Sequence, residues 1–247
     1  MKFRELLQLI GWQIINPFLL KRKKRRLYHF NEKFRGINLG CGLDNPPNWV
    51  GIDGGITHIL MSKLPKFLAK KIFSKFSMKK NYTFEEYCKK IKSIPLIHHD
   101  LRYGIPLNDK VVPHIYSSHF LEHLSRNDAE VLLKNCFRVL KPGGIIRIAV
   151  PSLEQTVLEI KASIIAYDKG DYNKIQPYVT SKKYDYLSQY SSHRYMYNFH
   201  SLKESLENTG FIEVKEFQMK RGNIPDVEKL DTRPSLFVEA IKPKIVT

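Results

Sequence analysis

The sequence predicts an α/β protein with a seven-stranded, mostly parallel sheet and helices on both faces. Short apolar segments alternate with helical patterns along most of the chain, which is typical of parallel sheets. Glycines and polar residues directly follow several of these segments, at the ends where ligands bind in such sheets. The 247 residues can build one sizeable core, and the sequence contains no internal repeat.

The strands are expected where apolar residues run together. They are predicted at 37–40, 49–53, 96–99, 112–117, 144–150, 211–218 and 235–241. One helix is predicted to begin near Phe120 and to stop at Lys141-Pro142-Gly143-Gly144, because proline cannot continue a helix. A second is predicted over Leu202–Asn208, with Gly210 as its terminating residue.

The connection between the first two strands is short. Only six residues, Leu43–Asn48, separate Gly42 from Trp49, whereas a crossover between parallel strands normally takes a dozen or more. The helix that usually fills this connection is therefore expected to be absent or reduced to a turn. The insertion at 57–95 is expected to pack in its place.

Glycines and carboxylates at the predicted strand ends indicate a small-molecule site. Gly40-Cys41-Gly42 follows the first strand, and glycine lets a backbone approach a ligand closely. Asp53 closes the second strand, where a carboxylate can accept hydrogen bonds from both hydroxyls of a ribose. Asp100 and Ser118 end the next two strands, so we expect these positions to converge on one ligand.

The order of these motifs resembles that of a known family. The chain carries LGCG at 39–42, then Asp53, HDL at 99–101, SSHFLEHL at 117–124, RVLKPGG at 138–144 and IRIAVP at 146–151. This series is similar to the class I S-adenosylmethionine-dependent methyltransferases, and most similar to the bacterial branch often encoded among surface-polysaccharide genes. The resemblance covers about 36–155 and resumes at 195–243. It implies a Rossmann-like sheet that ends in an antiparallel hairpin.

The resemblance also implies the cofactor, S-adenosylmethionine, and the residues that bind it. Gly40, Cys41 and Gly42 would pass its methionine part, and Asp53 would take the ribose hydroxyls. The remaining contacts it implies are Asp100 and Leu101 at the adenine edge, and Ser118 and His119 near the sulfonium. One departure is Asn38, which stands where the family usually has an acidic residue.

A hydroxyl acceptor needs a base near neutral pH, and histidine provides one most readily. His123 and His193 are the predicted catalytic residues. His193 precedes Tyr197 in a segment that resembles the family's His-x-x-x-Tyr.

His119-x-x-Glu122-His123 matches the spacing of an inverted zinc-protease motif. A protease is excluded by context, because the motif follows a buried parallel strand within a cofactor-binding framework. Some small-RNA and quinone-pathway methyltransferases bind a divalent ion through a similar Glu-His, so metal binding by these three residues stays open. The favoured interpretation has no metal, with Glu122 and His123 holding the loop by hydrogen bonds or a histidine acting as base.

The positive charge is concentrated in two segments. The formal net charge is +17, and residues 1–35 and 57–95 each contribute +8. Residues 1–35 are expected to form a basic amphipathic N-terminal segment, too short to cross a bilayer. It would lie on an anionic membrane surface or cap the domain.

The insertion at 57–95, within a methyltransferase domain spanning 36–247, is expected to contain two helices. The first carries Leu64, Phe67 and Phe73 among lysines, and the second begins after Thr83. Their apolar face would cover the sheet, line a pocket for an anionic acceptor, or share a membrane surface with the N-terminal segment. The tyrosine-rich stretch 155–200 is expected to form a lid over the acceptor.

We therefore expect an S-adenosylmethionine-dependent methyltransferase that O-methylates a sugar of a surface glycan or its lipid-linked precursor. The alternatives are an RNA methyltransferase, suggested by the charge, and a non-catalytic protein of this fold that docks on membrane or nucleic acid. Three scattered cysteines indicate a reducing compartment. The expected location is the cytoplasm, at the inner face of the membrane if residues 1–35 dock there.

Overall fold

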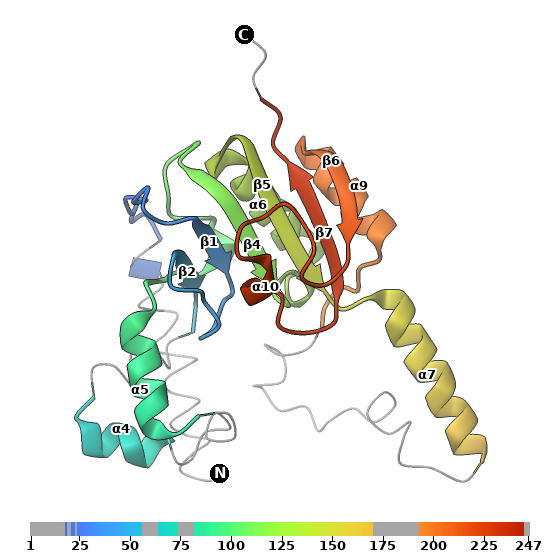
Figure 1. Ribbon diagram of the computed structural model, residues 1–247, viewed down its shortest axis with the longest axis horizontal. Helices are drawn as coiled ribbons and strands as arrows, with labels where there is room; N and C mark the ends of the chain where they lie inside the picture. The colour runs from blue at the N-terminus through green and yellow to red at the C-terminus, as the bar shows by residue number, and fades with distance from the viewer. Residues whose placement is uncertain are drawn as a thin grey trace.

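The computed structural model describes residues 18, 21–22, 24–55, 64–73, 82–169 and 193–244. Seven strands in these ranges form one sheet in the order β3-β2-β1-β4-β5-β7-β6 (Figure 1). The strands are β1 Gly36–Leu39, β2 Trp49–Asp53, β3 Leu96–His98, β4 Val112–Ser118, β5 Leu140–Val150, β6 Ile212–Phe217 and β7 Leu236–Ile241.

The sheet is mixed. β1 to β5 pair in parallel, whereas β7 runs antiparallel to both of its neighbours, β5 and β6. The predicted seven strands and C-terminal hairpin are confirmed. The predicted start of the fifth strand at 144 is wrong, because Leu140 already pairs with Val112 and the strand continues through the Lys-Pro-Gly-Gly segment past a register shift.

One face of the sheet is covered by α6 Arg126–Val139 and α9 Phe199–Thr209, which pack against each other. Both helices contribute buried leucines to the main core beneath them. Gly210 ends α9 with a φ of 105°, as predicted.

The opposite face is covered by the segment between β6 and β7, which contains α10 Val227–Leu230 (Figure 1). Trp49 and Tyr116 project from the sheet into a second cluster formed with Ile224, Val227 and Leu230. This layer of loop and short helix stands in place of longer helices on that side.

The helix predicted to begin at Phe120 begins six residues later. Leu121–His123 (η4) form a single 3₁₀ turn, and α6 starts at Arg126. Ser125 sets this start, because its hydroxyl accepts a hydrogen bond from the Asp128 amide as an N-cap. The HFLEHL segment is therefore a tight connection between β4 and α6.

The expectation of a missing crossover helix is confirmed. Residues 43–48, all of them described, form turns and irregular backbone with no helix. Leu43 packs against the cluster formed by α4 Lys66–Phe73 and α5 Phe84–Ser93. Lys90 of α5 also reaches the Asp44 carboxylate at 3.1 Å, so the insertion contacts this loop.

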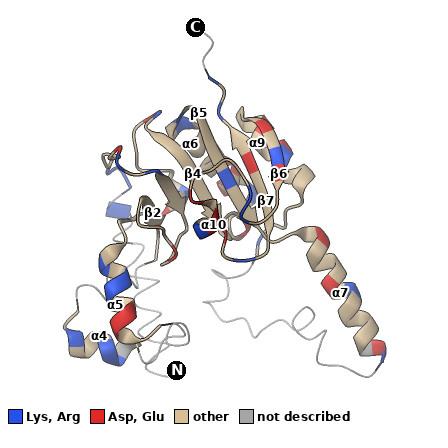
Figure 2. Cartoon of the chain, viewed as in Figure 1, with Lys and Arg blue, Asp and Glu red and all other residues tan. Residues whose placement is uncertain are grey.

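Lysines are prominent on α4 and α5 (Figure 2). Ala69 and Phe73 of α4 face α5, but Phe67 is 74% exposed between lysines. Phe67 therefore points away from the row formed by positions 69 and 73.

Helix α7, Leu153–Asp168, extends away from the sheet (Figure 1). Several of its apolar side chains are exposed, including Leu158 and Ile165. The remainder of the expected lid, 170–192, lies outside the described residues, as does the apolar part of the N-terminal segment. No helix within the described ranges has the length and apolar character needed to cross a bilayer.

Candidate active site

The loop after β1 is bonded directly to the end of β2. The Gly42 amide donates to Asp53 Oδ2 at 2.9 Å, and the Gly55 amide donates to Oδ1 at 2.6 Å. The Gly40 amide donates to the Ile52 carbonyl at 2.9 Å. The predicted convergence of the glycine loop and Asp53 is therefore present in the structure.

The two glycines of this loop share a left-handed backbone but differ in surroundings. Gly40 has a φ of 63°, and a Cβ added there would lie 2.4 Å from the Phe120 ring. Gly42 has a φ of 53°, and an added Cβ would meet nothing within 4 Å. Open space therefore lies beside Gly42, next to the Asp53 carboxylate, while Phe120 closes the loop at Gly40.

The end of β3 adjoins the same place through its backbone. The His99 amide donates to the Asp53 carbonyl at 3.0 Å, which brings Asp100 next to the end of β2. The Asp100 carboxylate pairs with the Arg102 guanidinium, with the shortest contact at 2.6 Å. Leu101 points into the main core, so its backbone is the part that can meet a ligand.

Cys41 and Asn38 support the loop from inside. Burial, followed by the Asp53 charge, raises the pKa of the Cys41 thiol, so the side chain is a packing group and only its backbone can contribute to the site. The Asn38 amide group donates to the Asp44 carbonyl at 2.8 Å. A carboxylate in this position could not donate, so asparagine matches this short connection.

Four ionisable side chains gather after β4. We call them the histidine–glutamate cluster: His119, Glu122, His123 and His193. Glu122 lies at the centre with a side chain that is 0% exposed. Its Oε1 lies 3.3 Å from His119 Nδ1 and 4.0 Å from Nε2 of both His123 and His193.

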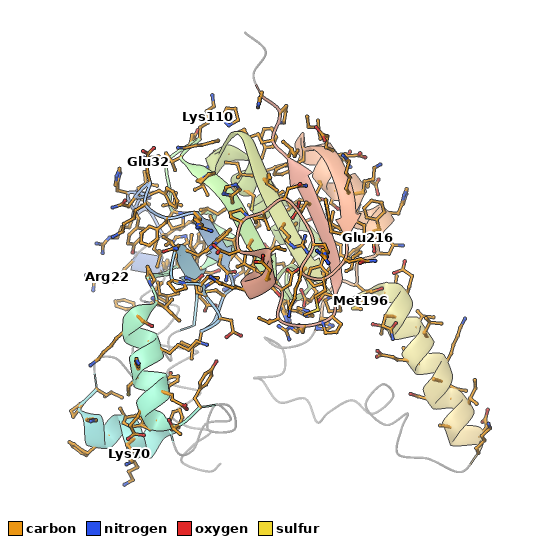
Figure 3. The ribbon with its side chains drawn as sticks, viewed as in Figure 1. Arg22, Glu32, Lys70, Lys110, Met196 and Glu216 are labelled. Carbon is orange, nitrogen blue, oxygen red and sulfur yellow. The ribbon has the colours of Figure 1, made fainter. Side chains whose placement is uncertain are left out.

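Backbone geometry brings these residues together. His119 has a φ of 49°, and its amide donates to the Ala149 carbonyl, which fixes the turn after β4 beside the end of β5. The Glu122 carbonyl accepts from the Arg194 and Tyr195 amides at 2.7 and 3.2 Å. These bonds place His193 beside η4. Figure 3 shows Met196, in the same segment, near the start of α7, and Lys110 at the opposite end of the sheet.

The electrostatics of the cluster favour neutral imidazole at its exposed edge. Burial lowers the pKa of His193, the Glu122 charge acts against this, and the neighbouring His123 and His119 lower it further. The rings of His123 and His193 stand edge to face with centroids 5.2 Å apart.

The structure thus brings together most of the predicted site residues. Gly40, Gly42 and Asp53 form one bonded unit, and Asp100 adjoins it. The sequence did not predict four residues that contact the site. The Phe120 ring lies against Gly40, and the Gly55 amide donates to the Asp53 carboxylate. The Arg102 guanidinium pairs with the Asp100 carboxylate, and the Ser235 hydroxyl lies 2.7 Å from His119 Nε2. A signal existed for two of them, because Gly55 and Arg102 each stand two positions after the carboxylate they contact.

One family model matches the chain. It is described as "Methyltransferase domain" and covers residues 39–148, less than half of the chain. The matched part contains the glycine loop, Asp53, Asp100 and three members of the histidine–glutamate cluster. His193 lies outside it. No curated protein matches the chain.

Solved structures of low similarity also match. A SAM-dependent methyltransferase from Archaeoglobus fulgidus is 17% identical with a TM-score of 0.47, over 96% of this chain and 99% of that one. One from Thermotoga maritima is 14% identical with a TM-score of 0.45, over 96% and 95%. Haemonchus contortus phosphoethanolamine N-methyltransferase 2 is 14% identical with a TM-score of 0.43, over 95% and 53%. The fold class follows from the strand order of the sheet.

The matched domain and the Rossmann-like sheet define the class: the chain is an S-adenosylmethionine-dependent methyltransferase, and S-adenosylmethionine is its cofactor. The residues at the strand ends fit this cofactor. The Asp53 carboxylate lies where a ribose is bound in such sheets, and the space beside Gly42 is open to a ligand.

Proposed function

We propose that this chain transfers a methyl group from S-adenosylmethionine to a sugar hydroxyl, in a surface glycan or its lipid-linked precursor. The observation that carries the proposal is that the histidine–glutamate cluster adjoins the cofactor loop. Phe120 stands between His119 and Glu122 in the sequence, and its ring lies against Gly40. This neighbourhood supports an acceptor site beside the cofactor.

In this proposal each strand end has one task in cofactor binding. The Gly40–Gly42 loop, Cys41 backbone included, contacts the methionine part, and Asp53 binds the ribose hydroxyls. The backbone of Leu101, beside Asp100, meets the adenine edge. Ser118 and His119 line the floor near the sulfonium.

When bound, the cofactor supplies a methyl group on a positively charged sulfur, which is a good leaving group. Alignment of the acceptor therefore provides much of the acceleration. In this transfer the acceptor oxygen would bond to the methyl carbon as the carbon–sulfur bond breaks, the electron pair would stay on sulfur, and the hydroxyl proton would pass to His123 or His193. His123 and His193 are the side chains we propose to contact this hydroxyl. Their side chains are 26% and 43% exposed, so an acceptor can approach from solvent.

The charge of α4 and α5 favours an acceptor that carries phosphate. These helices line a hollow of about 180 Å³ with mostly apolar residues and two lysines. Its lining residues are Leu64, Lys66, Ala69, Phe84, Cys88, Ile91 and Lys92. An apolar wall with a cationic rim suits a lipid-linked phosphosugar.

Methyl transfer to fractionated acceptors tests the function. The full chain, labelled S-adenosylmethionine and either lipid-linked saccharides, free polysaccharide or total RNA are incubated in parallel. We expect label in a saccharide fraction. Label in RNA instead would support the RNA methyltransferase. Calorimetry with S-adenosylmethionine alone identifies the third case, since a non-catalytic docking protein that does not use the cofactor gives no binding heat.

We also propose that the protein is cytoplasmic and docks on the inner face of the membrane. Phe67, exposed beside Lys66, Lys70 and Lys71, supports a surface of this kind. Flotation with anionic vesicles would compare the intact chain with one that starts at Phe34. The intact chain should float in larger amount, and equal flotation would contradict docking through the N-terminal segment.

A further inference from the structure

We propose that Glu122, His123 and His193 form a binding site for a divalent transition-metal ion. One ligand atom from each of the three lies within 4.8 Å of the other two. Two imidazoles and one carboxylate are a donor set that suits zinc and ferrous iron, with coordination positions left open. The set differs from the sequence motif, because His193 takes the place that spacing alone gives to His119.

The state of Glu122 is the first argument. Its side chain is fully buried, and neither carboxylate oxygen has a hydrogen-bond partner. A buried carboxylate that accepts no hydrogen bond is costly even with imidazoles 3.3–4.0 Å away, and a metal ion would compensate it. The chain satisfies two other buried carboxylates completely: Asp231 and Glu239 both pair with Arg147 and also accept backbone amides. Of these three buried carboxylates, Glu122 alone accepts no hydrogen bond.

The arrangement of the imidazoles is the second argument. Nε2 of His123 and Nε2 of His193 each lie 4.0 Å from Glu122 Oε1. Metal bonds of about 2.0–2.2 Å place the ligand atoms of one ion about 3–4 Å apart. A small contraction around an ion would complete the site. The amide bonds from Arg194 and Tyr195 to the Glu122 carbonyl already hold the two segments together.

His119 has a supporting position in this arrangement. Its Nδ1 faces Glu122 Oε1 at 3.3 Å, and its Nε2 lies 2.7 Å from the Ser235 hydroxyl. With a proton on Nδ1 it orients the carboxylate, in the way that ligating carboxylates are commonly held by a further hydrogen bond. Ser235 at the start of β7 then anchors the imidazole.

A metal here would deepen the proposed methyl transfer, and this step rests on that function. An acceptor oxygen in an open coordination position would be oriented toward the methyl group, and the ion would lower the pKa of the hydroxyl. His123 and His193 would then act as ligands through Nε2 and not as bases. The metal site itself can be measured without any acceptor.

The test is titration of the full chain, freed of metal with a chelator, with Zn²⁺ by calorimetry and with Co²⁺ by visible absorption. We expect one ion per chain and a d–d spectrum of low symmetry. The variant His193→Ala removes a partly exposed ligand and should lower Zn²⁺ affinity by at least about tenfold, since even outer partners of a metal site cost that much. Glu122→Gln should do the same with no change of shape.

His200→Ala is the matched control, because His200 is an exposed histidine on α9 outside the cluster. Its affinity for Zn²⁺ should equal that of the unmodified chain. The proposal is overturned if His193→Ala and His200→Ala bind equally well, or if the unmodified chain binds no ion. Should Glu122→Gln fail to fold, the His193→Ala comparison alone decides.

Failure of this inference and failure of the proposed function give different results. If the chain binds S-adenosylmethionine but neither ion, the metal-site proposal fails and the proposed function stands. If the chain binds Zn²⁺ through His193 but gives no heat with S-adenosylmethionine, the metal-site proposal stands and the proposed function fails.

Discussion

Gly40 and Gly42 show how one backbone conformation can have two different requirements. Both have positive φ, but only Gly40 is pressed by an aromatic ring. Gly42→Ala should therefore lose about 1–2 kcal/mol of unfolding free energy, from the left-handed backbone alone. Gly40→Ala should lose about 1–3 kcal/mol more, because its methyl group overlaps Phe120. Urea unfolding of the two variants measures the difference, and equal losses would contradict the Phe120 contact.

Asp53 is the residue on which cofactor affinity should depend most. Asp53→Asn replaces one acceptor oxygen by a donor that faces the Gly42 or Gly55 amide, and also removes the charge. A hydrogen bond to a charged group contributes about 1.5–3 kcal/mol, so S-adenosylmethionine affinity should fall by about 10- to 100-fold in calorimetry. Asp44→Asn is the control, because the Asp44 side chain is 69% exposed and pairs only with a lysine. Its affinity should stay within about twofold.

At this scale the sequence predicts residue types but not their partners. Gly40, Gly42 and Asp53 could be predicted because a turn and a strand end demand those residue types. The contact of Phe120 with Gly40 depends on how the turn after β4 is folded, and His119 adopts a positive φ there that no propensity predicts. For Arg102 the spacing of two positions from Asp100 is a signal, but the rotamer that forms the pair follows from the fold.

Helix α5 depends on its first turn for stability. Thr83 accepts from the Glu86 amide while Glu86 accepts from the Thr83 amide, which is a complete capping box. Thr83→Ala should cost about 1 kcal/mol locally. Hydrogen exchange of the Tyr87 amide, which bonds to the Thr83 carbonyl, should become about fivefold faster. Thr83→Ser keeps the hydroxyl and should exchange as before. Unchanged exchange in Thr83→Ala would contradict a stabilising cap.

Elements were predicted well where periodicity is strong and poorly where the chain turns. All seven strands and the cap of α5 agree with the sequence. The start of α6 was misjudged, because the apolar spacing of Phe120, Leu121 and Leu124 fits a helix as well as it fits a 3₁₀ turn beside a core. The early start of β5 was missed because Pro142 and Gly143 disfavour a strand, whereas pairing with β4 outweighs that preference.

At the scale of the whole molecule, one buried charge network joins the sheet to the loop that covers it. Arg147 of β5 donates to Asp231 at 2.6 Å and to Glu239 of β7 at 3.0 Å, and all three side chains are almost fully buried. The two carboxylates also accept from the amides of Lys220 and Asn223. The network therefore holds the segment between β6 and β7 against the sheet.

Asp231→Ala should destabilise the protein by about 3–5 kcal/mol, because it removes one partner of the buried pair with Arg147 and the acceptor of the Lys220 amide. Equilibrium unfolding in urea measures the loss. Glu130→Ala breaks an exposed ion pair on α6, in which the Arg126 side chain is 67% exposed and the Glu130 side chain 50%. This variant should change the free energy of unfolding by less than about 0.5 kcal/mol. Similar losses in the two variants would mean that the buried network contributes little.

The candidate site could be predicted only in part at this scale. The parallel sheet follows from the alternation of strands and helices, and with it the expectation that residues at the carboxyl ends of the strands lie close together. His193 joins Glu122 from about 70 positions later in the chain. This contact depends on the folded backbone, in which the amides of Arg194 and Tyr195 donate to the Glu122 carbonyl. The lack of a hydrogen bond to either carboxylate oxygen of Glu122 is likewise a property of the complete fold.

The bonds of Asp53 to Gly42 and Gly55 have a consequence for turnover. In the proposed site this carboxylate holds the sugar of the cofactor, a part that is identical before and after the reaction. The spent nucleoside should therefore be retained nearly as firmly as the fresh one and should compete with it. Sustained activity would then depend on continual removal of that by-product, S-adenosylhomocysteine, by another enzyme. Adding a hydrolase that degrades S-adenosylhomocysteine should reduce the slowing of progress curves.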